Sequence, residues 1–333
     1  MPRIVKKILI VVVVLFALGI AKDFALKIAI ESAASFVVGA PARIGHFSLS
    51  LLTSRVQIKN FRLYNPPGFP QEAMVDIPLI KVAYDLPALF KGKLHLPEMN
   101  INLSKLVLIR DKEGELNVDA LKVAQAPAKT EEKPKEKPQE KKSSKPMAMQ
   151  LDVVTMTLGR VVVKDYSKGG KVSILAYDIG VKNKEFKDIT SPEQLATLVL
   201  TRAMGPTALK SAGIYAAATV LGVGFLPAGV AGVLLSNDSA AQTFRQDYDR
   251  MYQAAWEALT ALGEIIEEKK GGQKSDASRT GDIKAKVQGT DVTLSVAEKE
   301  ARQVEVTIKA RKLMLPRPEV AGGVLYQIDE QLR

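Results

Sequence analysis

A run of apolar residues near the amino terminus constrains this chain more than any other feature of its sequence. Residues 8–21 read ILIVVVVLFALGIA and contain no charged or strongly polar side chain. Arg3, Lys6 and Lys7 precede the run, and the first acidic residue is Asp23. Because positive charge holds its flank of a membrane segment in the cytoplasm, we expect the chain after this run to be exported.

Two interpretations of the run remain open. Its fourteen residues are fewer than the roughly 20 that cross a bilayer, and Gly-Ile-Ala at residues 19–21 could be the cleavage site of a signal peptide. An uncleaved anchor would begin at Ile4 and continue past Lys22, and the helical spacing of the following apolar residues favours it. We therefore expect residues 1–40 to form a transmembrane helix and its extension. The side chains expected in the membrane are Ile8, Val12, Leu15 and Ile20.

Composition narrows the classes of function. The 333 residues include no cysteine, which excludes disulfides, thiolate metal sites and cysteine nucleophiles. The formal charge of +11 is compatible with nucleic acid or with anionic lipid headgroups as a partner. Aromatic residues make up only 6% of the chain, and no basic strand pair carries the aromatics of an RNA-binding sheet. We therefore expect no nucleic-acid partner.

Changes in periodicity and composition divide the chain into six segments. Residues 126–146 hold four prolines, seven lysines and four glutamates but no large apolar side chain, so burial cannot offset the entropy of ordering them. Ser-Pro-Glu-Gln at residues 191–194 forms a capping box and predicts a helix to about Met204. The expected segments are the anchor (1–40), a β-region (41–124), a disordered linker (125–147), further strands (148–188), a helical insertion (189–270) and C-terminal strands (271–333).

Alternation of apolar and polar residues predicts the strands. The phase reverses between Ile58 and Phe61, which predicts a bulge or bend near Asn60. The apolar faces could pack on helices or could leave a trough open to acyl chains, and the sequence alone does not separate these alternatives. The residues that would face lipid in the second case are Val56, Ile58, Val304, Val306 and Ile308.

Two segments of the helical insertion have several possible roles. Residues 211–237 carry no charge and could form a buried helical hairpin, a hairpin dipping into the membrane, or a true span. We favour the buried hairpin, because a span would separate the last strands from their partners. Apolar residues spaced three or four apart predict an amphipathic helix over residues 238–269, which could bind a partner protein.

Residues that could carry catalysis form no recognisable set. The two histidines, His46 and His95, lie in strand-like stretches, where a structural or solvent-facing role is favoured. Asp85 and Asp165 are explained as turn or strand-end residues. Since no sequence motif of a nucleophile, base or phosphate loop occurs, we expect no enzyme activity, no cofactor and no metal. An envelope hydrolase remains a weak alternative.

Four short segments resemble the AsmA family of bacterial envelope proteins in their order and spacing. They are ARIGHFSLS at residues 42–50, NPPGF at 65–69, IKVAYDLPALFKG at 80–92 and RDKEGELN at 110–117. The resemblance covers about residues 1–122. It implies a single-pass inner-membrane anchor with a cytoplasmic N-terminus, a β-rich periplasmic body, and a role in lipid homeostasis or outer-membrane assembly.

These observations predict an α+β fold of mostly antiparallel strands, with an N-terminal transmembrane helix and a curved, groove-like sheet carrying a helical insertion. The expected function is to handle or transfer phospholipid, or to support outer-envelope biogenesis, by shielding acyl chains on an apolar sheet face. Membrane phospholipid, and other envelope proteins besides, are the expected partners. The alternative is an envelope scaffold that binds no lipid and uses the linker and the 238–269 helix.

Overall fold

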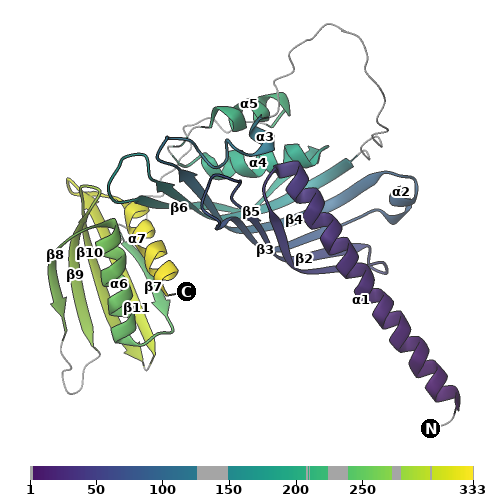
Figure 1. Cartoon of the computed structure of the whole chain (residues 1–333), viewed down its shortest axis with the longest axis horizontal. Coiled ribbons are helices and arrows are strands. Elements are labelled where there is room, and N and C mark those ends of the chain that lie inside the picture. The colour runs from purple at the N-terminus through teal and green to yellow at the C-terminus, as the bar shows by residue number, and fades with distance from the viewer. Residues whose placement is uncertain are drawn as a thin grey trace, which may run out of the picture.

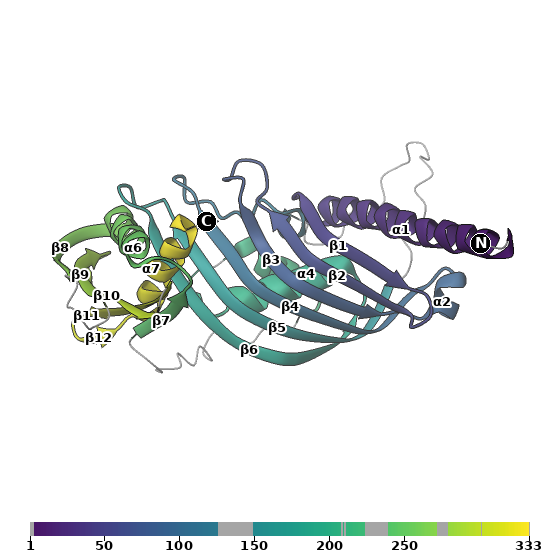
Figure 2. The same ribbon diagram turned by 90° about the horizontal axis from the view of Figure 1, so that it is seen from below.

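Two β-sheets with helices packed on them make up the chain (Figure 1). The computed structural model describes residues 3–125, 149–207, 209, 211–223, 239–271, 279–300 and 302–332, with side chains from residue 21 onward. Sheet A is strongly curved, and sheet B lies at the end of sheet A opposite the N-terminus (Figure 2). The predicted α+β class with mostly antiparallel, curved sheets is confirmed.

Sheet A has six strands in the order of the sequence. Neighbouring strands are antiparallel except β4 and β5, which are parallel. A parallel pair needs a crossover connection, and residues 111–148, which include the predicted linker, provide it. The linker itself lies outside the described residues from residue 126 onward. The strands of sheet A are β1 (Ala42–Ser50), β2 (Arg55–Tyr64), β3 (Ala73–Ala83), β4 (Leu94–Arg110), β5 (Met149–Asp165) and β6 (Ser173–Ile189).

The helix α1 (Arg3–Val38) runs unbroken from the apolar N-terminal run to the start of sheet A. Gly39 follows its last residue, and its φ of +80° suits the left-handed position after a helix. The backbone at Ile8, Val12, Leu15 and Ile20 is helical, and the side chains of these residues lie outside the description. In the part of the chain that the structure describes, no helix is both long and apolar enough to cross a membrane.

Four further helices accompany sheet A, namely α2 (Leu86–Phe90), α3 (Lys122–Gln125), α4 (Pro192–Met204) and α5 (Ala212–Val220). The predicted capping box is confirmed at α4, where Ser191 Oγ accepts from Gln194 N at 3.1 Å. Gln194 Oε1 in turn accepts from Thr190 N at 2.8 Å. Of the uncharged segment 211–237, α5 packs on α3 and α4 and buries Ile214, and residues 224–237 lie outside the described residues.

Sheet B and its two helices correct the prediction for the last third of the chain. Residues 238–269 do not form one helix, because strands β7 (Ser239–Phe244) and β8 (Gly263–Lys270) flank the shorter α6 (Tyr248–Leu262). Gly263 is extended, and a Cβ there would lie 2.2 Å from Lys286 O, so pairing with a neighbouring strand ends the helix. The other elements are β9 (Thr280–Val287), β10 (Thr290–Glu300), β11 (Gln303–Lys312), β12 (Leu315–Pro316) and an unpredicted helix, α7 (Pro318–Gln331).

Three residues predicted to face lipid lie instead in the core of sheet B. Val304, Val306 and Ile308 of β11 are each 0% exposed. They belong to one apolar cluster with side chains of α6 and α7, such as Met251 and Val324. The prediction is wrong for these three, because helices that the alternation could not reveal cover their face. Sheet B therefore fits the alternative in which the apolar face of the sheet packs on helices.

The helix α7 joins the two sheets. It packs on α6 and β11 and also on β6 of sheet A. Two glycines permit this contact, since a Cβ on Gly323 would lie 2.0 Å from Ile174 O, and one on Gly322 would lie 3.0 Å from Ala176 O. Ile174 and Ala176 are therefore part of the sheet B core although they belong to sheet A.

Candidate functional site

Apolar side chains form continuous rows across one face of sheet A. Residues paired directly across neighbouring strands share a face, so the register identifies each row. The first row crosses all six strands and contains Leu49, Val56, Val82, Met99, Val154 and Phe186. The second row contains Phe47, Ile58, Ile80, Ile101 and Met156 and ends at Lys184 on β6. We call these two the open rows.

Helices cover this apolar face unevenly. Farther along the strands, Leu103, Leu106 and Leu158 are buried in a cluster with side chains of α3, α4 and α5. Over the first row the cover is incomplete, and four of its six members are only half-buried. These four are Leu49, Val56, Met99 and Phe186. The open rows therefore contain buried apolar residues next to apolar residues that solvent can reach.

Behind the open rows, the opposite face of sheet A is polar, whereas closer to sheet B residues such as Val107, Val162 and Ile174 on sheet A are buried in the sheet B core. The residues adjacent to the first row form a row of their own, consisting of Ser48, Gln57, Lys81, Asn100, Thr155 and Glu185. No large apolar side chain interrupts it on any of the six strands. In the region of the open rows the sheet thus has one face suited to hydrocarbon and one suited to water.

A change in the alternation of side chains along β2 keeps the apolar residues of both halves of the strand on the apolar face of the sheet. Asn60 has a φ of +54°, and the predicted bend at this residue is confirmed. Its neighbour on β1 is Gly45, where a Cβ would lie 2.9 Å from the Asn60 Cβ. Because a strand with unbroken alternation would turn Phe61 and Leu63 away from the core, the left-handed residue restores them to the side of Ile58.

The structure places the other two predicted lipid-facing residues in the open rows. Val56 is half-buried in the first row, whereas Ile58 is largely covered, in a cluster with Leu26 and Ile30 of α1. Met99 and Phe186 were not among the predicted lipid-facing residues. Their alternation was visible, but only the register between strands far apart in the sequence shows that they continue the row of Val56.

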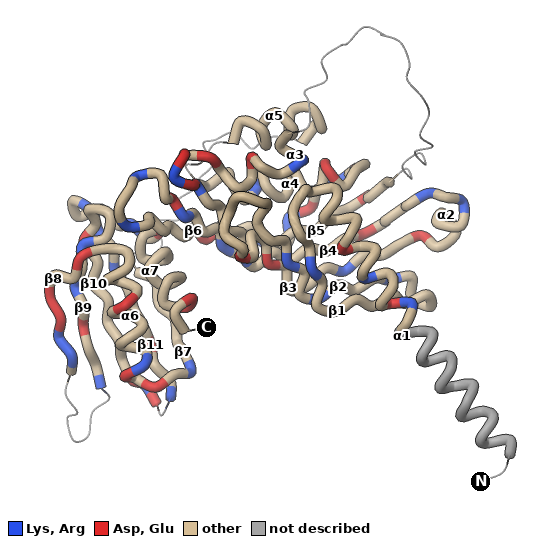
Figure 3. The backbone as a smooth tube through the Cα atoms, viewed as in Figure 1, with Lys and Arg blue, Asp and Glu red and all other residues tan. Residues whose placement is uncertain are grey.

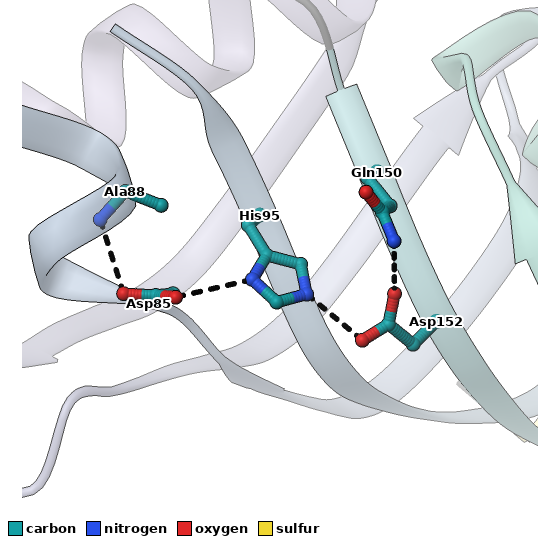
Figure 4. A network of polar contacts seen from close by, with 5 residues as sticks. All are labelled: Asp85, Ala88, His95, Gln150 and Asp152. Atoms are coloured by element: carbon teal, nitrogen blue, oxygen red, sulfur yellow. Dashed lines mark hydrogen bonds and ion pairs between the residues drawn. The ribbon is translucent and has the colours of Figure 1, made fainter. Parts of the chain in front are cut away.

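A histidine flanked by two aspartates lies near α2 (Figure 4). His95 Nδ1 is 3.2 Å from Asp85 Oδ2, and His95 Nε2 is 2.8 Å from Asp152 Oδ2. Asp85 also caps α2 by accepting from Ala88 N at 3.0 Å. The imidazole therefore links the start of α2 to strands β4 and β5. This agrees with a structural role for His95 and corrects the expectation that turn chemistry alone explains Asp85.

The hydrogen bonds of this bridge shift the pKa of all three groups. Hydrogen bonds to Asp152 and Asp85 raise the pKa of His95 above its ordinary 6.5. A hydrogen bond from His95 lowers the pKa of Asp152, and hydrogen bonds from Ala88 N and then His95 lower that of Asp85, below their ordinary 3.8. The aspartate contribution is present above pH 3.8 and is lost as pH falls. The histidine contribution is complete below pH 6.5 and is lost as pH rises through the raised pKa.

Substitution of His95 by glutamine is therefore expected to flatten the pH dependence of stability. Between about pH 6 and 9, the midpoint of thermal unfolding should fall more steeply for the unaltered protein than for His95→Gln. The measurement is thermal unfolding across this range, with His46→Gln as the control that retains the bridge. Equal slopes for the unaltered protein and His95→Gln would contradict the proposed linkage.

The described residues contain no group of three or more His, Cys, Asp or Glu side chains that could hold a metal. His95 uses its two nitrogens for carboxylates on opposite sides, so the bridge is not a chelating arrangement. A hollow of about 500 Å³ on the polar face, between sheet A and α7, is lined by mixed charges that include the ion pair of Arg160 with Asp178.

Comparison with known proteins decides the family. The family model described as the AsmA family matches residues 8–306. The chain belongs to the AsmA family. No curated protein matches the sequence. Membership supports a protein associated with the cell envelope. The match extends well beyond residue 122, where the resemblance of the short segments ended, and includes the predicted helical insertion at residues 189–270.

Two of the segments that carried the family resemblance are joined in the structure. Asn117 Nδ2, at the end of RDKEGELN, donates to Asn65 Oδ1 of NPPGF at 2.7 Å. Asn117 also donates to Val107 O at 3.0 Å and accepts from Ile109 N at 3.0 Å. Asn65 donates to Pro70 O at 2.8 Å, which closes its own turn. The two motifs thus form a buried clasp, defined by Asn65 and Asn117, at the end of β4.

Proposed function

We propose that this protein is a non-enzymatic, single-pass protein of the bacterial inner membrane. The N-terminal part of α1 would be its anchor, and the open rows would shield phospholipid acyl chains on the periplasmic side. The observation that carries this proposal is the unbroken apolar row on six strands, from Leu49 to Phe186, four of whose six members are only half-buried.

The physical basis is the free-energy cost of leaving apolar surface in contact with water. The four half-buried members of the first row keep hydrocarbon in contact with water, and an acyl chain laid on them would gain about 0.8 kcal/mol for each methylene buried. The polar row on the reverse face can remain solvated at the same time. Lys184, exposed at the β6 end of the second row, is placed to meet a lipid phosphate.

The scaffold alternative loses one of its two supports in the structure. It used the linker, which lies outside the described residues, and the apolar face of an amphipathic helix over residues 238–269. That face, including Met251, Ala255 and Leu259 of α6, is buried against sheet B. The lipid proposal uses a surface that the described residues leave partly uncovered.

The test is site-specific photocrosslinking of the full-length protein in cells. A benzophenone amino acid at Met99 is expected to capture phospholipid about tenfold more than one at Asn100, because adjacent strand residues point to opposite faces. Mass spectrometry of the purified adduct measures the lipid. The Asn100 variant is a matched control, since it lies one residue away in the same strand. Equal capture at both positions would overturn the proposal.

A further inference from the structure

Two apolar tips, the turn between β1 and β2 and the helix α2, lie side by side at one end of sheet A. Tyr84 joins them, since its backbone N donates to Ser54 O at 3.0 Å and its hydroxyl donates to Ser50 O at 3.0 Å. Ser50 and Ser54 flank the turn between β1 and β2. The next residue, Asp85, is the N-cap of α2, so turn and helix are held together.

Each tip presents large apolar side chains to solvent. Leu52 in the turn is 100% exposed, and Phe90 at the end of α2 is 84% exposed. Leu51 and Leu89 beside them are also exposed. We call these four residues the apolar platform. Clustered apolar side chains of this size usually mark a surface that contacts a partner or a membrane.

The helix α1 places the platform beside the end of the N-terminal apolar run. Lys22 Nζ donates to Leu49 O at 2.7 Å, and Asp23 Oδ1 accepts from Leu49 N at 3.2 Å. The run ends at residue 21, and Leu49 precedes the platform residue Leu51 by two positions. The first charged residues after the run are therefore fixed to the strand that leads into the platform.

The basic residues around the apolar platform favour a membrane with anionic phospholipid as its partner. Lys91 and Lys93 follow α2, and Arg55 follows the other tip, with all three exposed. The basic stretch after α2 is visible as blue segments of the chain in Figure 3. The nearby Asp85 is engaged by His95. Exposed apolar side chains with lysines and arginines around them match the interface of a membrane that contains anionic phospholipid.

We infer that the apolar platform inserts into the headgroup layer of the same membrane that holds α1. This inference rests on the proposed function, because it needs the N-terminal part of α1 in the bilayer. The platform and α1 would give the body two attachments to one bilayer and fix its orientation. The first row, with its four half-buried members, would then lie near the lipid surface, so an acyl chain could pass onto the row of Met99 with little exposure to water.

The absence of cysteine makes a site-specific test direct. Single cysteines replace Leu52, Phe90, Leu15 and Glu113 in the full-length protein, and each is labelled with an environment-sensitive fluorophore. Glu113 is exposed in the turn after β4, at the opposite end of sheet A. The proteins are reconstituted into vesicles of phosphatidylethanolamine and phosphatidylglycerol with brominated acyl chains. Bromine quenching is expected to be about threefold stronger at positions 52 and 90 than at 113.

The outcomes separate the platform from the anchor. Quenching at position 15, with positions 52 and 90 no more quenched than 113, would overturn the platform and leave the anchor standing. No quenching at position 15 would overturn the proposed function as well. Strong quenching at 113 would also contradict the inference, since the whole body would then lie on the bilayer. The double variant Lys91→Glu, Lys93→Glu should lower quenching at position 90 only in vesicles with phosphatidylglycerol.

Discussion

Replacement of Asn117 by alanine is expected to lower the free energy of unfolding by about 3–5 kcal/mol. The side chain is fully buried and makes three hydrogen bonds in the clasp. Pairing of β3 with β4 ends at Leu106, and the Asn117 amide serves the next polar groups of β4, the Val107 C=O and the Ile109 N–H. Alanine would leave both buried groups without this partner.

The measurement is urea unfolding of the full-length protein in detergent, followed by near-ultraviolet circular dichroism. Asn100→Ala is the matched control, because that amide lies on the polar face and bonds only to exposed Glu98. A loss for Asn117→Ala within about 0.5 kcal/mol of the loss for the control would contradict the role assigned to the clasp.

Replacement of Gly323 by alanine is expected to destabilise the joint between the two sheets by about 2 kcal/mol or more. A Cβ at this position would lie 2.0 Å from Ile174 O, which is a backbone atom and cannot rotate away. Glycine to alanine inside a helix ordinarily stabilises by about 1 kcal/mol. A destabilisation would therefore oppose the intrinsic preference of α7 and report its contact with β6.

Trp256, the only tryptophan, is exposed on α6, whose opposite face belongs to the same core, so its fluorescence follows the unfolding of this helix. Gly205→Ala is the control, since Gly205 has a helical φ of −48° and its Cβ would meet nothing nearer than 3.6 Å. The Gly323 variant should also become open to proteases at the contact where α7 packs on β6. An unchanged midpoint of fluorescence unfolding would show that α7 does not need its close approach to β6.

Local sequence signals predicted many elements of sheet A. Alternation identified the strands, the capping box located the start of α4, and the phase change identified the bend at Asn60. These features depend on residues near one another in the chain, so the sequence contains the physical cause. The order of the four family-like segments likewise anticipated the AsmA family.

Features that depend on residues far apart in the sequence were not predicted. The parallel pairing of β4 and β5 follows from a long crossover, and alternation does not record strand direction. His95 gained two carboxylates from positions 10 and 57 residues away. The helix α7 had a visible start in Pro318 and Glu319, with apolar residues such as Val320 and Val324 after it, but the strands before it directed attention to sheet alone.

The sequence by itself determined an apolar N-terminal helix, two-faced strands and membership of a family, because hydropathy, periodicity and turn chemistry are local properties. Only the tertiary structure decided which apolar faces are closed. Val306 and Met99 carry the same kind of alternation, yet α6 and α7 cover the first, while the cover over the second is incomplete. Burial depends on what packs across a face, and that partner comes from elsewhere in the chain.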